Sequence, residues 1–149
     1  ITAVDTANTV VKFLGFVTPN LDGTTTPDVH LCRLELTNST TLTATRALLS
    51  ASYGRTVRCE VIEYWPGTFR SIQRGTITLA TVLSNTATIT AVTTAKTTLD
   101  LLGFTSDYNN SSNNVEAVEI VLTDSTTVTA NVANLAQTQI VSYQVVEWW

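Results

Sequence analysis

Histidine, cysteine and carboxylate side chains are the groups that could perform catalysis or bind a metal in this chain, and they are few. His30 is the only histidine, and Cys32 and Cys59 are the only cysteines. Nucleophilic catalysis needs a hydroxyl or thiol beside a base, usually histidine, that a third group orients. A lone histidine at a strand start is typical of a surface position, and the 26 residues between the cysteines match no metal-binding spacing. We therefore expect no enzyme activity, catalytic residue, metal site or cofactor.

The acidic residues are dispersed along the chain, and no two of them have the spacing of an acid/base pair. Glu63 and Glu147 stand out because each lies in an apolar strand pattern two residues before a tryptophan. We expect both carboxylates to accept bonds from nearby backbone or arginine groups. The loop 107–114 is rich in oxygen ligands, but it holds a single acid and no EF-hand spacing, which favours a solvated loop over a calcium site.

Two pairs of adjacent aromatic residues end two of the apolar segments: Tyr64-Trp65 and Trp148-Trp149. Neighbouring residues of a strand point to opposite faces, so one ring of each pair should enter a core. The other ring then needs a second surface, which is a contact between parts of this chain, a neighbouring subunit or a sugar. We take these four residues, with Arg70 and Arg74, as candidates for interface contacts.

These residues are carried by a sequence that occurs twice. Residues 1–16 and 89–104 share ten of sixteen positions, 36–44 and 122–130 share seven of nine, and 57–65 and 141–149 share four of nine. The offset falls from 88 to 86 to 84, so two loops are shorter in the second copy. A duplicated apolar framework favours an architectural role over a catalytic centre, which needs unlike residues to converge once.

The pattern within each copy is that of short strands. Segments such as 76–80, 86–92, 115–122 and 126–130 alternate apolar and polar residues, and 140–149 forms a closing strand. The first copy repeats this over 30–36, 40–45 and 56–65, while 6–14 and 94–102 favour strand over helix. Together these patterns predict an all-β protein of two tandem, small antiparallel sandwiches or barrels of immunoglobulin-like type.

The repeat divides the chain into a first unit, 1–67, and a second unit, 68–149. The first unit has no equivalent of residues 75–88 and so lacks its first strand, which upstream sequence or a neighbouring subunit would have to supply if it exists. Loops 18–29 and 106–114 have unrelated sequences at the same place in the two copies, so we expect them to be variable tips on a constant scaffold. Each unit is near the lower size limit for an independent core, which predicts packing between units or subunits.

Charge and cysteine content limit the partners. The net charge is −4, and a net-acidic chain without a basic run argues against nucleic acid as a partner. The charge is uneven, since residues 1–74 hold seven of the eight lysines and arginines. No apolar run is long enough to span a bilayer. Val118 and Tyr143 replace the two cysteines in the second copy, so the framework needs no disulfide. We expect buried thiols, with a Cys32–Cys59 disulfide as the alternative.

Residues 61–92 contain the runs EYWPG, SIQRGTIT and TITAV, and this segment resembles repeats of tailed-bacteriophage virion structural proteins. The resemblance extends over both copies. It implies a protein on the outside of the phage particle, either a capsid decoration (cement) protein or a tail or head fibre module. Its partners would be other virion proteins and further copies of itself.

We therefore expect a non-enzymatic virion protein, with capsid decoration ahead of a fibre or adhesin that binds host carbohydrate. Because most of the lysines and arginines precede residue 75, the first unit is expected to dock on the particle and the acidic second unit to face outward. The chain is expected to form a homo-oligomer, because many weak contacts on a symmetric lattice add up through effective concentration.

Overall fold

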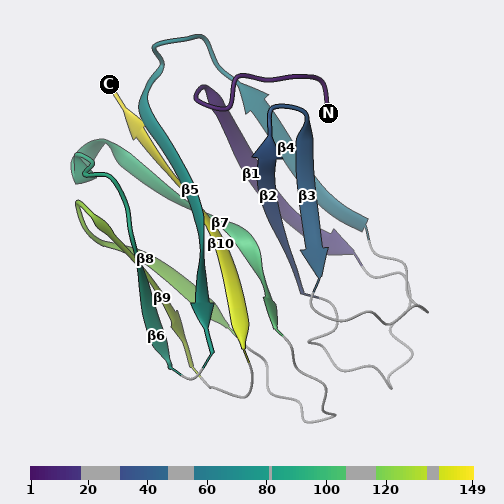
Figure 1. Cartoon of the computed structure of the whole chain (residues 1–149), viewed down its shortest axis with the longest axis vertical. Helices are drawn as coiled ribbons and strands as arrows, with labels where there is room; N and C mark the ends of the chain where they lie inside the picture. Colours follow the sequence, from purple (N-terminus) through teal and green to yellow (C-terminus); the bar gives the residue numbers. More distant parts are fainter. Residues whose placement is uncertain (18–30, 47–55, 81, 107–116, 134–137) are drawn as a thin grey trace.

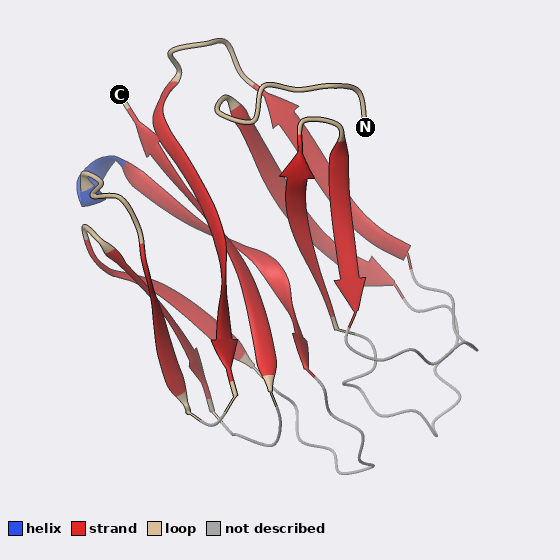
Figure 2. Ribbon diagram, viewed as in Figure 1, coloured by secondary structure: helices blue, strands red, loops and turns tan. Residues whose placement is uncertain are grey.

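The computed structural model describes residues 1–17, 31–46, 56–80, 82–106, 117–133 and 138–149. These residues form antiparallel strands and one short 3-10 turn, so the predicted all-β fold is confirmed (Figures 1 and 2). The elements, in chain order, are β1 (Thr9–Val17), β2 (Cys32–Asn38), β3 (Thr41–Arg46), β4 (Thr56–Glu63), β5 (Phe69–Leu79), β6 (Ser84–Thr88), η2 (Thr94–Lys96), β7 (Thr97–Ser106), β8 (Val118–Asp124), β9 (Thr127–Val132) and β10 (Gln139–Trp148).

The strands make three sheets, and the largest is shared by the two units. Its strand order is β3-β2-β7-β10-β5, so the β2–β3 hairpin of the first unit extends the β7-β10-β5 sheet of the second. A three-stranded sheet, β6-β9-β8, packs on one face of β7-β10-β5, and β1 and β4 form a pair of their own. The immunoglobulin-like character of each unit stays a prediction.

The repeated sequences adopt the same pairing in both units. Thr9 of β1 lies opposite Glu63 of β4, and Thr97 of β7 lies opposite Glu147 of β10, which is the same register after the sequence offset. Both hairpins, β2–β3 and β8–β9, carry an irregularity at their ends. Bonds in the turns recur as well: Val4 N–H donates to Ser39 O at 2.9 Å, and Val92 N–H donates to Ser125 O at 2.9 Å.

The Leu-Gly-Phe motif of each copy forms a bulge with a left-handed glycine. Gly15 has φ +101° in β1, and Gly103 has φ +91° in β7. The β1–β4 register shifts beside Gly15, and the β7–β10 register shifts opposite Gly103. Glycine is required for the backbone at these positions because a Cβ disfavours positive φ.

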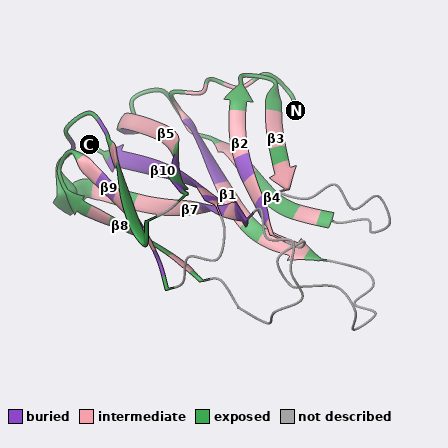
Figure 3. Ribbon diagram, turned by 60° about the horizontal axis from the view of Figure 1, so that its bottom comes forward, coloured by how far each residue is buried: buried purple, intermediate pink, exposed green. Residues whose placement is uncertain are grey.

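The main core lies in the second unit. Its buried members come from β5, β9 and β10 and the segment after β6, and they include Ile77, Val128, Val141 and Val145; partly buried residues of β7 pack against them. Strand β10 is buried on both faces, since the three-stranded sheet covers one face and the first unit covers the other (Figure 3). The first unit has a smaller cluster around Val11, in which the side chains of β1, β2 and β7 meet.

Two strand boundaries differ from the expectation. Strand β5 begins at Phe69, seven residues before the predicted start at Thr76, because its first half pairs with the end of β10 and faces the first unit. A bulge opposite Glu147 turns Phe69 to the same side as Ile72, which breaks the alternation that would have shown the strand. Strand β6 ends at Thr88, and residues 94–96 form the 3-10 turn in place of strand.

Strands β5 and β6 have no counterparts among the described residues of the first unit. The chain nevertheless enters both units at the same place. The Ile1 ammonium donates to Thr40 O at 3.0 Å, and the Ile89 N–H donates to Thr126 O at 2.8 Å. Strands β3 and β4 are consequently edge strands in the described structure, whereas their equivalents β9 and β10 are flanked on both sides. The variable loops 18–29 and 107–114, with His30, lie outside the described residues.

Candidate interaction site

The contact between the two units is the most elaborate polar site in the described structure. Gln144 of β10 is fully buried, accepts from the Val11 N–H at 3.2 Å and donates to Val11 O at 3.4 Å. Arg74 of β5 donates to Gln144 Oε1 at 3.0 Å, to Thr6 O at 3.1 Å and to Thr9 O. Burial lowers the pKa of the Arg74 guanidinium from its ordinary value. Gln144 and Arg74 therefore bond backbone groups in the first half of β1 and in the segment that precedes it.

The second part of the contact is a close approach of two backbones. Strand β2 pairs with β7 at Gly103, where an added Cβ would lie 2.3 Å from Cys32 O and 3.1 Å from the Arg33 Cα. Beside this glycine, Leu102 is 1% exposed and packs with Leu34 of β2. Glycine is therefore needed at this position for two reasons: it allows the positive φ, and its lack of a side chain leaves room for the neighbouring strand.

Ion pairs surround this contact between β2 and β7. Arg33 Nη1 lies 2.5 Å from Glu35 Oε2 and donates to Ser142 Oγ of β10 at 3.3 Å. Lys12 of β1 and Asp100 of β7 lie 2.9 Å apart and link the two units. Both pairs are partly exposed, so each contributes less than about 1 kcal/mol to stability and acts mainly on the fit of the units.

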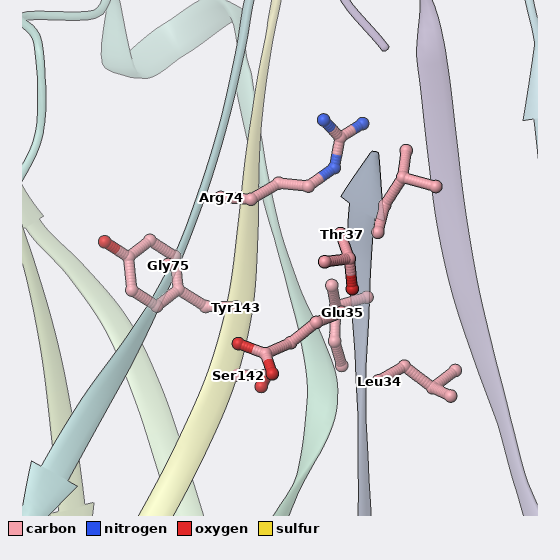
Figure 4. Close-up of a pocket in the computed structure, with 9 residues that line it drawn as sticks. Leu34, Glu35, Thr37, Arg74, Gly75, Ser142 and Tyr143 are labelled. Atoms are coloured by element: carbon pink, nitrogen blue, oxygen red, sulfur yellow. The ribbon is translucent and has the colours of Figure 1, made fainter. Parts of the chain in front are cut away.

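A cavity of about 230 Å³ opens beside the β2–β7 contact, between β2 and the β5–β10 pair. Figure 4 shows Glu35 extending from β2 toward Ser142, with the ring of Tyr143 next to Gly75. A Cβ on Gly75 would lie 2.7 Å from the Tyr143 hydroxyl, so the ring fills the place of a side chain there. Burial raises the pKa of Tyr143, which keeps this hydroxyl protonated. In this cavity lining, the Tyr143 ring therefore forms a contact between β10 and β5.

Some of the aromatic rings pack against one another, and others lie apart on the surface. Tyr64, Phe69 and Trp148 form an edge-to-face cluster with ring centroids 4.7–6.3 Å apart, over the Val10 side chain. This cluster joins Tyr64, which follows β4, to Phe69 of β5 and Trp148 of β10, so these rings lie where the two units meet.

Trp65 and Trp149 lie on the surface, with exposed fractions of 86% and 68%. In each adjacent pair the final tryptophan is therefore the ring that lies outside the core, because both follow the last paired residue of their strands. A hollow of about 440 Å³ lies beside Trp65 and is lined by Asp5, Asn8 and Glu63.

Glu63 and Glu147 have the predicted framework role. Glu63 accepts from the Asp5 N–H at 2.6 Å, and Glu147 accepts from the Thr93 N–H at 2.7 Å. The Thr93 N–H, together with the nearby Arg70 guanidinium 3.8 Å away, holds the pKa of Glu147 below its usual range. Arg70 itself is largely exposed. Of the two arginines chosen from the sequence, Arg74 lies inside the contact and Arg70 at its margin.

The cysteines form no disulfide with each other: Cys32 is buried and Cys59 is exposed. The prediction of a buried thiol is therefore wrong for Cys59. Its equivalent in β10, Tyr143, is covered by Gly75 of β5, and β5 has no described counterpart beside β4.

The described residues were compared with the patterns of metal sites and membrane spans. Among the described residues, no three histidine, cysteine or acidic side chains come together as metal ligands. No helix in that part of the chain is long and apolar enough to cross a membrane. Comparison of the chain with protein families, curated proteins and solved structures found no match.

Sequence reasoning did not identify Gln144, Gly103 or Arg33 as contact residues. The only available signal was the glycine of the repeated Leu-Gly-Phe motif, which marks a backbone requirement in both units. Neither Gln144 nor Arg33 is repeated, since Glu60 and Glu119 occupy the equivalent positions. Residues that differ between copies are therefore the ones that specify which surfaces meet.

Proposed function

We propose that this chain is a non-enzymatic structural protein of a bacteriophage particle, and specifically a protein that decorates the capsid surface. The observation that carries the proposal is the repeated framework, in which the shared polar groups bond backbone in both units. Glu63 and Glu147 each accept a backbone N–H, and Asn38 and Asp124 each bond the turn residue two positions later. Side chains used in this way position strands and are not available for catalysis.

The resemblance of residues 61–92 to virion repeats supports the particle as the location. Exposed strand edges at β3 and β4 and the surface rings of Trp65 and Trp149 supply places for contacts with other virion proteins. Seven of the eight lysines and arginines lie in residues 1–74, against six acids, which supports docking through that part of the chain, with the more acidic remainder outward. Nucleic acid and membrane are not among the proposed partners.

The test is the copy number of the chain on purified particles. Phage particles from a culture that produces the protein are sedimented, and the chain is quantified by mass spectrometry against the major capsid protein. A decoration protein is expected at hundreds of copies and a fibre at tens. Absence of the chain from washed particles would refute both forms of the proposal.

The second candidate is a fibre or adhesin module that binds carbohydrate, and the hollow beside Trp65 favours it. An exposed indole next to carboxylate and amide groups suits a sugar, which stacks on the ring and bonds to the polar groups. Glycan-array binding that Trp65→Ala abolishes and Trp149→Ala preserves would support this role. No binding by the parent protein would remove it.

A further inference from the structure

The surface that β7 presents to β2 in the contact between the units has an equivalent on β1, and in the described structure no strand lies against it. Gly15 occupies the same bulge in β1 that Gly103 occupies in β7. The backbone of β2 lies against Gly103, whereas an added Cβ on Gly15 would meet no atom within 4 Å in the described structure. The neighbouring leucines show the same contrast: Leu102 is 1% exposed and Leu14 is 56% exposed.

The strand that would fit Gly15 is also present with a free edge. Strand β8 is the equivalent of β2, and in the described structure it pairs only with β9. Inside the chain, Arg33 of β2 lies opposite Gly103. The repeat offsets of 86 and 88 convert this pair into Glu119 opposite Gly15.

We propose that copies of this chain associate head to tail, with β8 of one copy pairing with the second half of β1 of the next, at Gly15. The occupant of the exposed β1 edge is thus a second copy of the same chain. The proposal rests on the geometry of the internal contact and does not depend on the role in a virion.

Apolar residues also occupy the equivalent positions of the repeat: Leu14 is exposed, and Leu99 and Ile120 are half-buried against the core of the second unit. Leu102 is buried with Val11 and Leu34 inside the chain. In the contact between copies, Leu14 takes the place of Leu102. Leu99 and Ile120 of the neighbouring copy take the places of the other two residues.

The charged and polar residues of the internal contact are replaced by others at the equivalent positions, and the replacements also attract each other. Arg33 of β2 contacts Ser142 of β10 inside the chain. The equivalent residues are Glu119 of β8 and Arg58 of β4, and both are exposed. The contact between copies therefore places a carboxylate next to a guanidinium, an attractive pair at the rim of the interface.

This association differs from a closed dimer in a measurable way. The two contacting surfaces are different, so each added copy presents a new β8 edge and growth does not stop at two. The ladder is short, because β2 and β7 share one register pair. We therefore expect weak, concentration-dependent assembly that strengthens when copies are held close together.

The test is sedimentation velocity of the full chain over a wide concentration range. The parent is expected to grow past the dimer as concentration rises. Gly15→Ala should weaken association by at least about tenfold, since its Cβ would meet the backbone of β8. The matched control is Gly67→Ala, which also has a positive φ (+84°) and open space, and it should associate like the parent.

Charge reversal gives a second, independent arm on exposed side chains. Glu119→Arg and Arg58→Glu should each weaken association by roughly 3–10-fold, and the double variant should recover it. A mixture of the two single variants should recover growth past the dimer, with the two variants alternating, because every contact between unlike variants joins a basic and an acidic surface.

Three results would overturn the proposal. The first is a parent that remains monomeric throughout the range, and the second is a parent that stops at a dimer. The third is association that either Gly15→Ala or both charge reversals leave unchanged.

Discussion

Alanine at Gly103 should destabilise the protein far more than alanine at Gly15, although both glycines have positive φ in equivalent bulges. An alanine with positive φ costs about 1–2 kcal/mol relative to glycine, and both variants bear that cost. At Gly15 nothing further is lost, because the space around it is open.

At Gly103 the added Cβ lies 2.3 Å from Cys32 O, whereas such carbon–oxygen contacts are normally about 3.3 Å. The obstructing atom is backbone, so β2 must move by about 1 Å. That movement weakens the β2–β7 pairing, at about 1 kcal/mol for each hydrogen bond, and loosens the packing of Leu34 on Leu102. We expect a total of about 3–5 kcal/mol for Gly103→Ala and about 1–2 kcal/mol for Gly15→Ala.

Urea unfolding of both variants, at protein concentrations low enough to prevent association, measures the difference directly. Equal free energies of unfolding for the two variants would refute the claim that β2 lies against Gly103. A smaller slope of the transition for Gly103→Ala alone would indicate that the units unfold separately, which the shared sheet argues against.

Four further variants and one control test other parts of the structure. Trp65→Ala and Trp149→Ala should each change the free energy of unfolding by less than about 1 kcal/mol, because both rings are exposed; a large loss in thermal denaturation would contradict the surface position. Arg74→Met should lower stability by about 2–4 kcal/mol, since it leaves the backbone carbonyls of the first unit without their donors, and Arg70→Met is the exposed control. Glu147→Gln should reduce the acid sensitivity of the protein. Its lowered pKa contributes stability that is present above the unfolded-state pKa and lost as pH falls through the folded-state value, so identical slopes of stability against pH below about 5 would disprove this role.

Sequence patterns predicted the framework well because its signals are local. Alternating apolar residues, turn residues and repeated motifs identified most strands, and the aligned Glu63 and Glu147 were correctly read as backbone acceptors. Strand β5 was predicted too short because the bulge near Phe69 interrupts the alternation.

The contact between the units was not predictable in the same way. Gln144 bonds Val11, a residue 133 positions earlier in the chain, and no local pattern connects them. The exposure of Cys59, Trp65 and Trp149 likewise depends on which strands cover which edges. Sequence periodicity indicates that a strand has an apolar face, but it does not show whether another element covers that face.

Hydrogen–deuterium exchange of the parent protein at low and high concentration tests the central claim most directly, which is that one repeated strand contact holds the chain together and extends it between copies. Raising the concentration should slow exchange in residues 14–17 of β1 and 118–121 of β8, and leave 41–46 of the β3 edge unchanged. Assembly without slower exchange in both of the first two segments, or with protection at β3 instead, would contradict the account.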